Sequence, residues 1–163
     1  MADEFRTLMV REPAGVPPAV VVDRVLAKLT AYLAEHPLGR LYTPAMGFMV
    51  ERPPGGVRAP DIAFVKADRL PVPPPSAFPA LAPDLAVDVL TPEQWPKEIL
   101  ERVTQWLRAG TDVVWVFEPQ RSVARIYRRE GTEEFIAAEG AMRGEELLPG
   151  LSFPLTEVFP PGS

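Results

Sequence analysis

The chain has 163 residues, of which 47% are hydrophobic and 24% are charged, as is ordinary for a globular protein. This length predicts a single domain, 1–163, that can bury a core without a disulfide or a metal staple. The sequence has no cysteine and one histidine, His36, which excludes a disulfide framework and a zinc site built from Cys and His. The formal net charge of −5 argues against indiscriminate binding to nucleic acid.

The sequence also lacks membrane and secretion signals. No apolar run approaches the roughly 20 residues of a membrane helix. The start, MADEFRTLMVREPAG, carries acidic residues and lacks the long apolar core of a signal peptide. We therefore expect no membrane contact and a cytoplasmic protein.

The first half of the chain predicts a strand, a helix and three further strands. Residues 1–18 contain a weak strand, Phe5 to Val10, and a loop rich in Pro and Gly. Residues 19–36 repeat apolar side chains at three- and four-residue steps, which indicates an amphipathic helix. Strands are predicted at 41–50 (with a kink at Pro44), at 61–65 and at 84–90. The last is almost continuously apolar, which is typical of a central strand covered on both faces.

The second half predicts a helix and three strands. The helix covers 96–109, and Gly110 stands where a C-terminal cap belongs. The strands are predicted at 112–118, 123–128 and 134–138, and the tail, 147–163, is expected to pack along one edge. The whole is a mixed α/β (α+β) fold, a sheet flanked by two main helices.

Two aspartates in apolar strands are the main candidates for chemistry. Asp61 opens the strand 61–65, and Asp88 lies inside the strand 84–90. A buried, isolated carboxylate costs several kcal/mol unless it is paired or binds a metal. Asp88 therefore needs a divalent cation shared with Asp61, or a cationic side chain of the following helix, for which Arg102 and Lys97 are candidates.

Each candidate also has a purely structural interpretation. Asp88 can form a salt bridge with Arg102 without any chemistry, and Asp61 can cap the turn after Pro60. Arg125 and the exposed side of its hairpin are candidates for phosphate contacts, or simply a solvated strand face. We find no nucleophile-elbow serine and no phosphate-binding glycine pattern.

Four segments, taken in order, carry a resemblance to a known family. They are APDIAFVKADRL, APDLAVDVLTPE, ERVTQWLRAGTDVVWVFEPQRSVARIYR and ELLPGLSFPLTEVF. Together they resemble the Uma-two family, bacterial proteins described as restriction endonucleases within the PD-(D/E)XK nuclease superfamily, over about Val22 to Phe159. The resemblance implies a restriction-endonuclease-like mixed sheet with flanking helices. It also implies a carboxylate site that binds Mg²⁺ or Mn²⁺ while DNA is cut.

The resemblance also implies roles for single residues. The family's strand-opening acid falls on Asp61, and its acidic residue in the next strand, usually Glu, falls on Asp88. The family's helix lysine, four residues before an aromatic residue, corresponds to Arg102. Leu90 stands where the wider superfamily often has Lys, and Thr7 stands at an early Glu position.

Two functions follow from this resemblance. In the first, the protein is a metal-dependent DNA endonuclease in which Asp61, Asp88 and the Val89 carbonyl hold the cation and Arg102 orients or neutralises the scissile phosphate. In the second, it is a catalytically degenerate nuclease fold that acts as a binding or assembly module. The acidic charge, Arg102 and Thr7 favour the second. A homodimer is also expected, with a sheet edge or the tail as its interface, because the C-terminal stretch is apolar.

Overall fold

The computed structural model describes residues 16–47, 59–94 and 96–160. The strand predicted at Phe5 to Val10, together with Thr7 and the end of the strand predicted at 41–50, lies outside these ranges. Within the described ranges, no helix is both long enough and apolar enough to cross a bilayer.

A six-stranded mixed sheet forms the centre of the molecule, with its strands in chain order. The strands are β1 (Gly39–Tyr42), β2 (Ile62–Lys66), β3 (Leu85–Val89), β4 (Val113–Glu118), β5 (Val123–Arg128) and β6 (Glu133–Ile136). Neighbours are antiparallel except β3 and β4, which are parallel. A parallel pair needs a crossover connection, and helix α3 (Pro96–Ala109) provides it.

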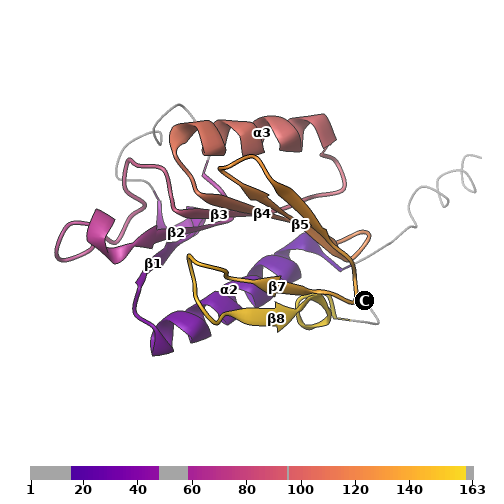
Figure 1. Cartoon of the computed structure of the whole chain (residues 1–163), viewed down its shortest axis with the longest axis horizontal. Helices are drawn as coiled ribbons and strands as arrows, with labels where there is room; N and C mark the ends of the chain where they lie inside the picture. Colours follow the sequence, from indigo (N-terminus) through magenta and orange to yellow (C-terminus); the bar gives the residue numbers. More distant parts are fainter. Residues whose placement is uncertain (1–15, 48–58, 95, 161–163) are drawn as a thin grey trace, which may run out of the picture.

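The sheet is covered on both faces, as Figure 1 shows. Helix α3 lies on one face. Helix α2 (Pro18–Glu35) and a small second sheet of β7 (Ala141–Arg143) and β8 (Ser152–Pro154) lie on the other. Single 3₁₀ turns connect these elements at Pro44–Met46, Ala67–Arg69 and Leu155–Glu157. The predicted fold class is confirmed.

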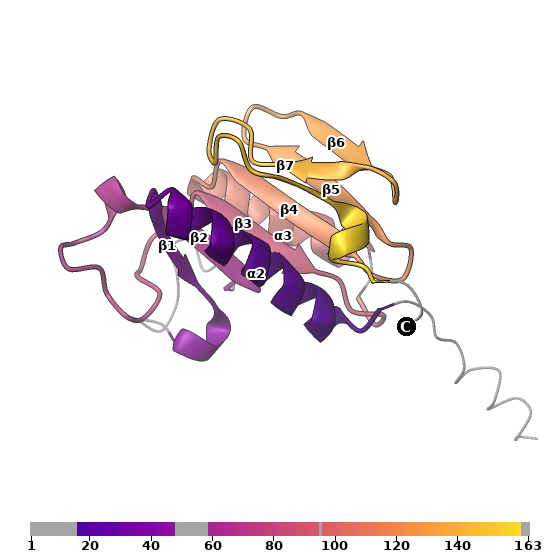
Figure 2. The same cartoon turned by 90° about the horizontal axis from the view of Figure 1, so that it is seen from below.

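The apolar spacing of the two helices decides how they pack. In α2, the buried side chains Val21, Val25 and Leu29 recur every four residues and join the core below the sheet. In α3, Ile99, Val103 and Trp106 form a separate core with Val114 and Val116 of β4. The view from below shows α2 running beneath the middle strands (Figure 2).

The tail differs from its expected place. Leu148, Phe153 and Phe159 are buried in the same core as α2. The Phe153 ring lies 6.1 Å from that of Trp115 on β4, so the tail covers a face of the sheet and not its edge. Three-residue strands between Gly and Pro carry too short a pattern to reveal this from the sequence.

The first described strand also has different limits from those predicted. β1 begins at Gly39 and ends at Tyr42, and Pro44 opens a 3₁₀ turn in place of a kink within a longer strand. Proline has no N–H for the sheet ladder, which explains why the strand stops before it.

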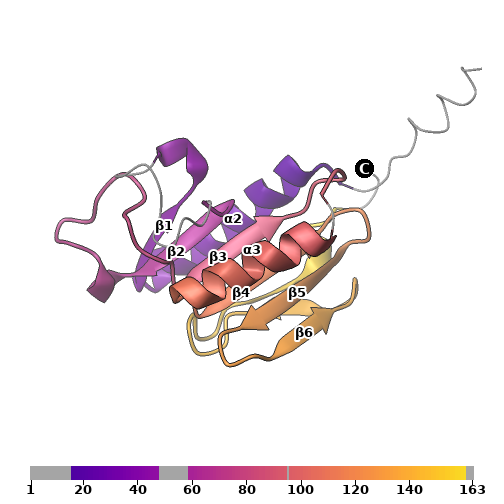
Figure 3. The same cartoon turned by 90° about the horizontal axis from the view of Figure 1, so that it is seen from above.

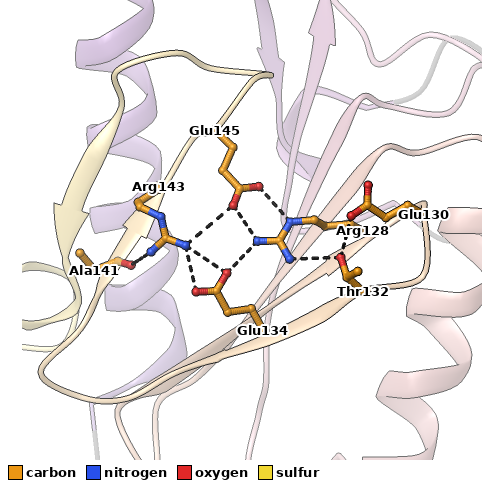
Figure 4. A network of polar contacts seen from close by, with 7 residues as sticks. All are labelled: Arg128, Glu130, Thr132, Glu134, Ala141, Arg143 and Glu145. Atoms are coloured by element: carbon orange, nitrogen blue, oxygen red, sulfur yellow. Dashed lines mark hydrogen bonds and ion pairs between the residues drawn. The ribbon is translucent and has the colours of Figure 1, made fainter.

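A network of four charged side chains ties the two sheets together (Figure 4). Arg128 contacts Glu134 at 2.7 Å and Glu145 at 2.6 Å, and Arg143 contacts Glu134 at 2.9 Å. Two arginines and two glutamates balance one another, so this cluster serves as a structural clamp and not as a site that attracts a ligand.

Candidate functional site

The buried carboxylate of Asp88 is paired with Arg102. Asp88 and Ala86 are two residues apart in β3 and therefore lie on the same face of the sheet, which packs against α3. Only 4% of the Asp88 side chain is exposed. One Arg102 nitrogen, Nη2, lies 3.3 Å from Asp88 Oδ1 and 3.1 Å from Oδ2. Of the two cationic side chains considered for Asp88, Arg102 makes the contact, and Lys97 is exposed in the first turn of α3.

The geometry of this ion pair is not the strongest one available. A guanidinium and a carboxylate bind best through two parallel N–H···O bonds from two nitrogens. Here a single nitrogen serves both oxygens, and Arg102 Nε is buried without a hydrogen-bond partner. The guanidinium carbon lies 5.4 Å from the ring centre of Trp106, one helical turn later. Arg102 is therefore held by packing as well as by charge, and part of its donor capacity is unused.

Asp61 directly precedes β2, and its side chain adds one hydrogen bond to the ladder between β2 and β3. The Leu90 N–H donates to Phe117 on β4, so by alternation the Val89 N–H points toward β2. Asp61 Oδ2 accepts that N–H at 2.8 Å. The carboxylate thus takes the place of a missing backbone acceptor, a role close to the turn cap considered from the sequence.

The sheet register brings the two aspartates to the same end of adjacent strands. Ile62 pairs with Val87 as the last pair of the ladder, and Asp61 and Asp88 come directly after this pair on the two chains. Their carboxylates nevertheless have different partners, because Asp61 binds a backbone N–H and Asp88 binds Arg102.

A hollow of about 300 Å³ opens beside Asp61. It lies between the end of β3 and the first turns of α2, and its lining is Pro18, Ala19, Val22, Asp23, Asp61, Val89 and Thr91. No sequence pattern connects Asp23 with Asp61, because that proximity depends on how α2 packs under the sheet. Within the described ranges, no three Asp, Glu, His or Cys side chains are grouped so as to hold a metal ion.

The available donors still suit a hard divalent cation. Mg²⁺ is commonly held by one or two carboxylates and keeps several waters. The Val89 carbonyl points to the same side of β3 as its N–H, toward Asp61. Asp61, Asp88 and the Val89 carbonyl are the oxygen donors that a cation could use here, with Asp88 on the α3 face of the sheet and the hollow beside Asp61 on the α2 face.

Another buried acid, Asp84, has a structural role. Its Oδ2 accepts the Lys66 N–H at 2.8 Å and lies 2.9 Å from Arg69 Nη1. These contacts anchor the turn after β2. These contacts explain why a charged side chain is buried at the start of β3 without a catalytic or metal-binding role.

Comparisons with known proteins agree with this architecture. The model of the family Uma2, described as "Putative restriction endonuclease", matches residues 7–156, so the chain belongs to the Uma2 family. A crystal structure described as a "putative nuclease belonging to DUF820" from Anabaena variabilis ATCC 29413 superposes with a TM-score of 0.70. The superposition covers 92% of this chain and 84% of that chain, at 16% sequence identity, which shows a shared fold. No curated protein matches the chain significantly.

Proposed function

We propose that this Uma2-family protein is a nuclease that hydrolyses phosphodiester bonds of DNA with Mg²⁺ or Mn²⁺. Asp61, Asp88 and the Val89 carbonyl would hold the cation. The observation that supports this most is the β2–β3 register, which carries both aspartates to one end of adjacent central strands. The family assignment supports nuclease chemistry in general.

The proposed roles follow from the chemistry of each side chain. When bound, the cation supplies positive charge at the phosphate and lowers the pKa of a bound water. Asp61, directly before β2, and Asp88, within β3, offer oxygen ligands from positions held by the sheet. Arg102 cannot give up its proton, so it acts by neutralising and orienting the scissile phosphate and not as a base.

Plasmid cleavage with Mg²⁺ or Mn²⁺ tests this proposal. Asp61→Asn and Asp88→Ala should each lower the cleavage rate at least about 100-fold, since even residues that only support metal ligands are worth 10- to 100-fold. Asp112→Asn is the matched control, because Asp112 also precedes a strand but pairs with Arg129 at 3.2 Å and lies at the start of β3, the opposite end from Asp88. Cleavage that survives both substitutions contradicts the assignment of the site.

Calorimetric titration separates metal binding from catalysis. The wild-type chain should bind Mn²⁺ at millimolar concentration or below, and Asp61→Asn should remove most of the heat. Absence of binding in the wild-type protein would count against a metal-dependent nuclease even if a contaminating activity cuts the plasmid.

A second candidate function has its own support. Arg102 already neutralises both oxygens of Asp88, as expected for a nuclease fold that has lost its metal and serves as a binding or assembly module. A folded wild-type protein that neither binds Mn²⁺ nor cleaves DNA would favour this function.

The homodimer remains a prediction with a weakened basis. The C-terminal apolar side chains that suggested it are buried within the chain's own core. Sedimentation equilibrium tests it directly, and a single species of monomer mass over the whole concentration range would refute it.

A further inference from the structure

Helix α3 leaves part of its face of the sheet uncovered. The helix packs on Val114 and Val116 of β4, and the strands β5 and β6 extend beyond it (Figure 3). A groove of about 540 Å³ lies there, between the first turns of α3, the loop after β3 and the β4–β5 hairpin. This volume falls within the range of pockets that hold small molecules.

The groove combines an apolar floor with a polar rim. Val116 and Tyr127 contribute apolar surface from the sheet, and Ile99 and Leu100 contribute it from α3. Gln94, Glu118, Gln120, Arg121, Arg125 and Glu133 contribute polar groups to its lining. Such a site suits a flat, largely apolar ligand with hydrogen-bonding groups at its edge.

Arg125 offers a stacking surface within this groove. Its guanidinium carbon lies 5.0 Å from the ring centre of Phe135, and its Nε lies 3.9 Å from Glu133. Its side chain is 30% exposed, and Phe135 is 51% exposed. Guanidinium planes backed by an aromatic ring are surfaces on which unpaired bases stack.

The groove lies on the same face of the sheet as Asp88. One row of the sheet runs from Asp88 through Val116 and Arg125 to Phe135. Strands are about 4.8 Å apart, so Arg125 lies roughly 10 Å from Asp88 on the same face. Thr91 borders both this groove and the hollow beside Asp61. A nucleotide next to the scissile phosphate can span this separation.

The charges of the rim favour a base over a phosphate. Glu118 accepts two hydrogen bonds from Arg121, at 2.8 and 3.1 Å, and Glu133 lies beside Arg125, so the rim is nearly neutral. A phosphate would therefore gain little electrostatic attraction from the rim. Base edges carry both donors and acceptors, which carboxylates and side-chain amides can match.

We infer that the groove binds an unpaired base of the DNA strand that is cut, so that the substrate is single-stranded DNA or DNA with unpaired nucleotides at the cleavage point. This inference rests on the proposed nuclease function for its biological meaning. A base inside a duplex is stacked and paired, and it cannot enter a side groove unless it leaves the helix.

Fluorescence anisotropy of labelled oligothymidylate in EDTA tests the inference without cleavage. Wild-type protein should bind the single strand more tightly than the matching duplex. Arg125→Ala should weaken binding at least about fivefold, the lower end of base stacking effects. Arg125→Lys should weaken it too, because the ammonium keeps the charge but loses the stacking plane.

Two further variants complete the test. Leu100→Trp should fill the groove and weaken binding without altering the sheet, while Arg108→Ala, an exposed arginine at the other end of α3, should have no effect. Unchanged affinity in both Arg125→Ala and Leu100→Trp overturns the inference, as does equal binding of duplex or no binding at all. A change of oligomeric state in these variants, with binding unchanged, would instead make the groove a contact between copies.

The outcome is separable from that of the proposed function. Binding that is lost in the groove variants, with no metal-dependent cleavage by the wild type, would keep the base site and reject the nuclease. Metal-dependent cleavage by the wild type, together with unchanged binding of single-stranded DNA by the groove variants, would support the nuclease and reject the base site.

Discussion

The Asp88 carboxylate is 4% exposed, and one nitrogen of Arg102 contacts both of its oxygens. Removing a cationic partner of a buried carboxylate is destabilising, and a charge left without compensation costs roughly 3 kcal/mol or more. We expect Arg102→Met to lower the free energy of unfolding in urea denaturation, by up to about 3 kcal/mol. The double variant Asp88→Leu/Arg102→Met should recover most of the loss, because it buries no charge.

The same substitution distinguishes a metal ligand from a structural acid. If Asp88 binds a cation, Arg102→Met should gain more thermal stability from Mn²⁺ than the wild type does, because the cation then supplies the missing charge. Equal shifts in the two proteins would indicate that Asp88 does not contact the metal.

For single residues, the sequence predicts that a buried charge has a partner, but it does not predict the geometry of the contacts. The cost of an unpaired buried charge was enough to predict a partner for Asp88, and Arg102 is that partner. The bond from the Val89 N–H to Asp61 was not predictable, because it depends on which backbone groups the β2–β3 register leaves without acceptors. The sequence makes Arg125 a candidate for phosphate contacts, but its stacking on Phe135 depends on the pairing of β5 with β6.

Among the elements, α3 determines where Arg102 lies, and Gly110 ends that helix. The Gly110 N–H bonds to Leu107 and the Thr111 N–H bonds to Trp106, the pattern of a Schellman cap. Gly110 has a φ of +117°, which favours glycine, while an added Cβ would meet only Ala82 at 3.9 Å. The cost of a side chain here is therefore backbone strain and not a clash.

We expect Gly110→Ala to lower the free energy of unfolding by about 1–2 kcal/mol. Gly110→Asn should cost less, because asparagine tolerates positive φ better than alanine does. Thermal or urea denaturation of the two variants checks the order. Equal losses would show that volume and not conformation limits this position.

Long periodic elements were predictable and short ones were not. The helices at 18–35 and 96–109 and the buried strand β3 follow from their apolar spacing and lie within a residue or two of prediction. β7 and β8 have three residues each, too few for a period to show. Their pairing under the sheet depends on contacts far apart in the chain, which local patterns do not encode.

At the scale of the whole molecule, the network of Arg128, Glu134, Arg143 and Glu145 joins β5 and β6 of the main sheet to the small sheet (Figure 4). Hydrogen bonds from Arg128 and then from Arg143 lower the pKa of Glu134 from its ordinary 4.5. A hydrogen bond from Arg128 likewise lowers the pKa of Glu145. Ionisation of both carboxylates therefore stabilises the folded state.

The sign of the pH dependence follows from these lowered pKa values. The stabilisation is fully present above the unfolded pKa of about 4.5 and is lost as pH falls through the lower folded pKa of each group. We expect the free energy of unfolding to fall steeply below pH about 4.5, and Glu134→Gln to flatten that fall while lowering stability at pH 7. Urea denaturation across this range measures both effects. Glu139→Gln is the control, since Glu139 is exposed and lies outside the network. An unchanged acid slope in Glu134→Gln would mean that the clamp between the two sheets does not depend on these charges.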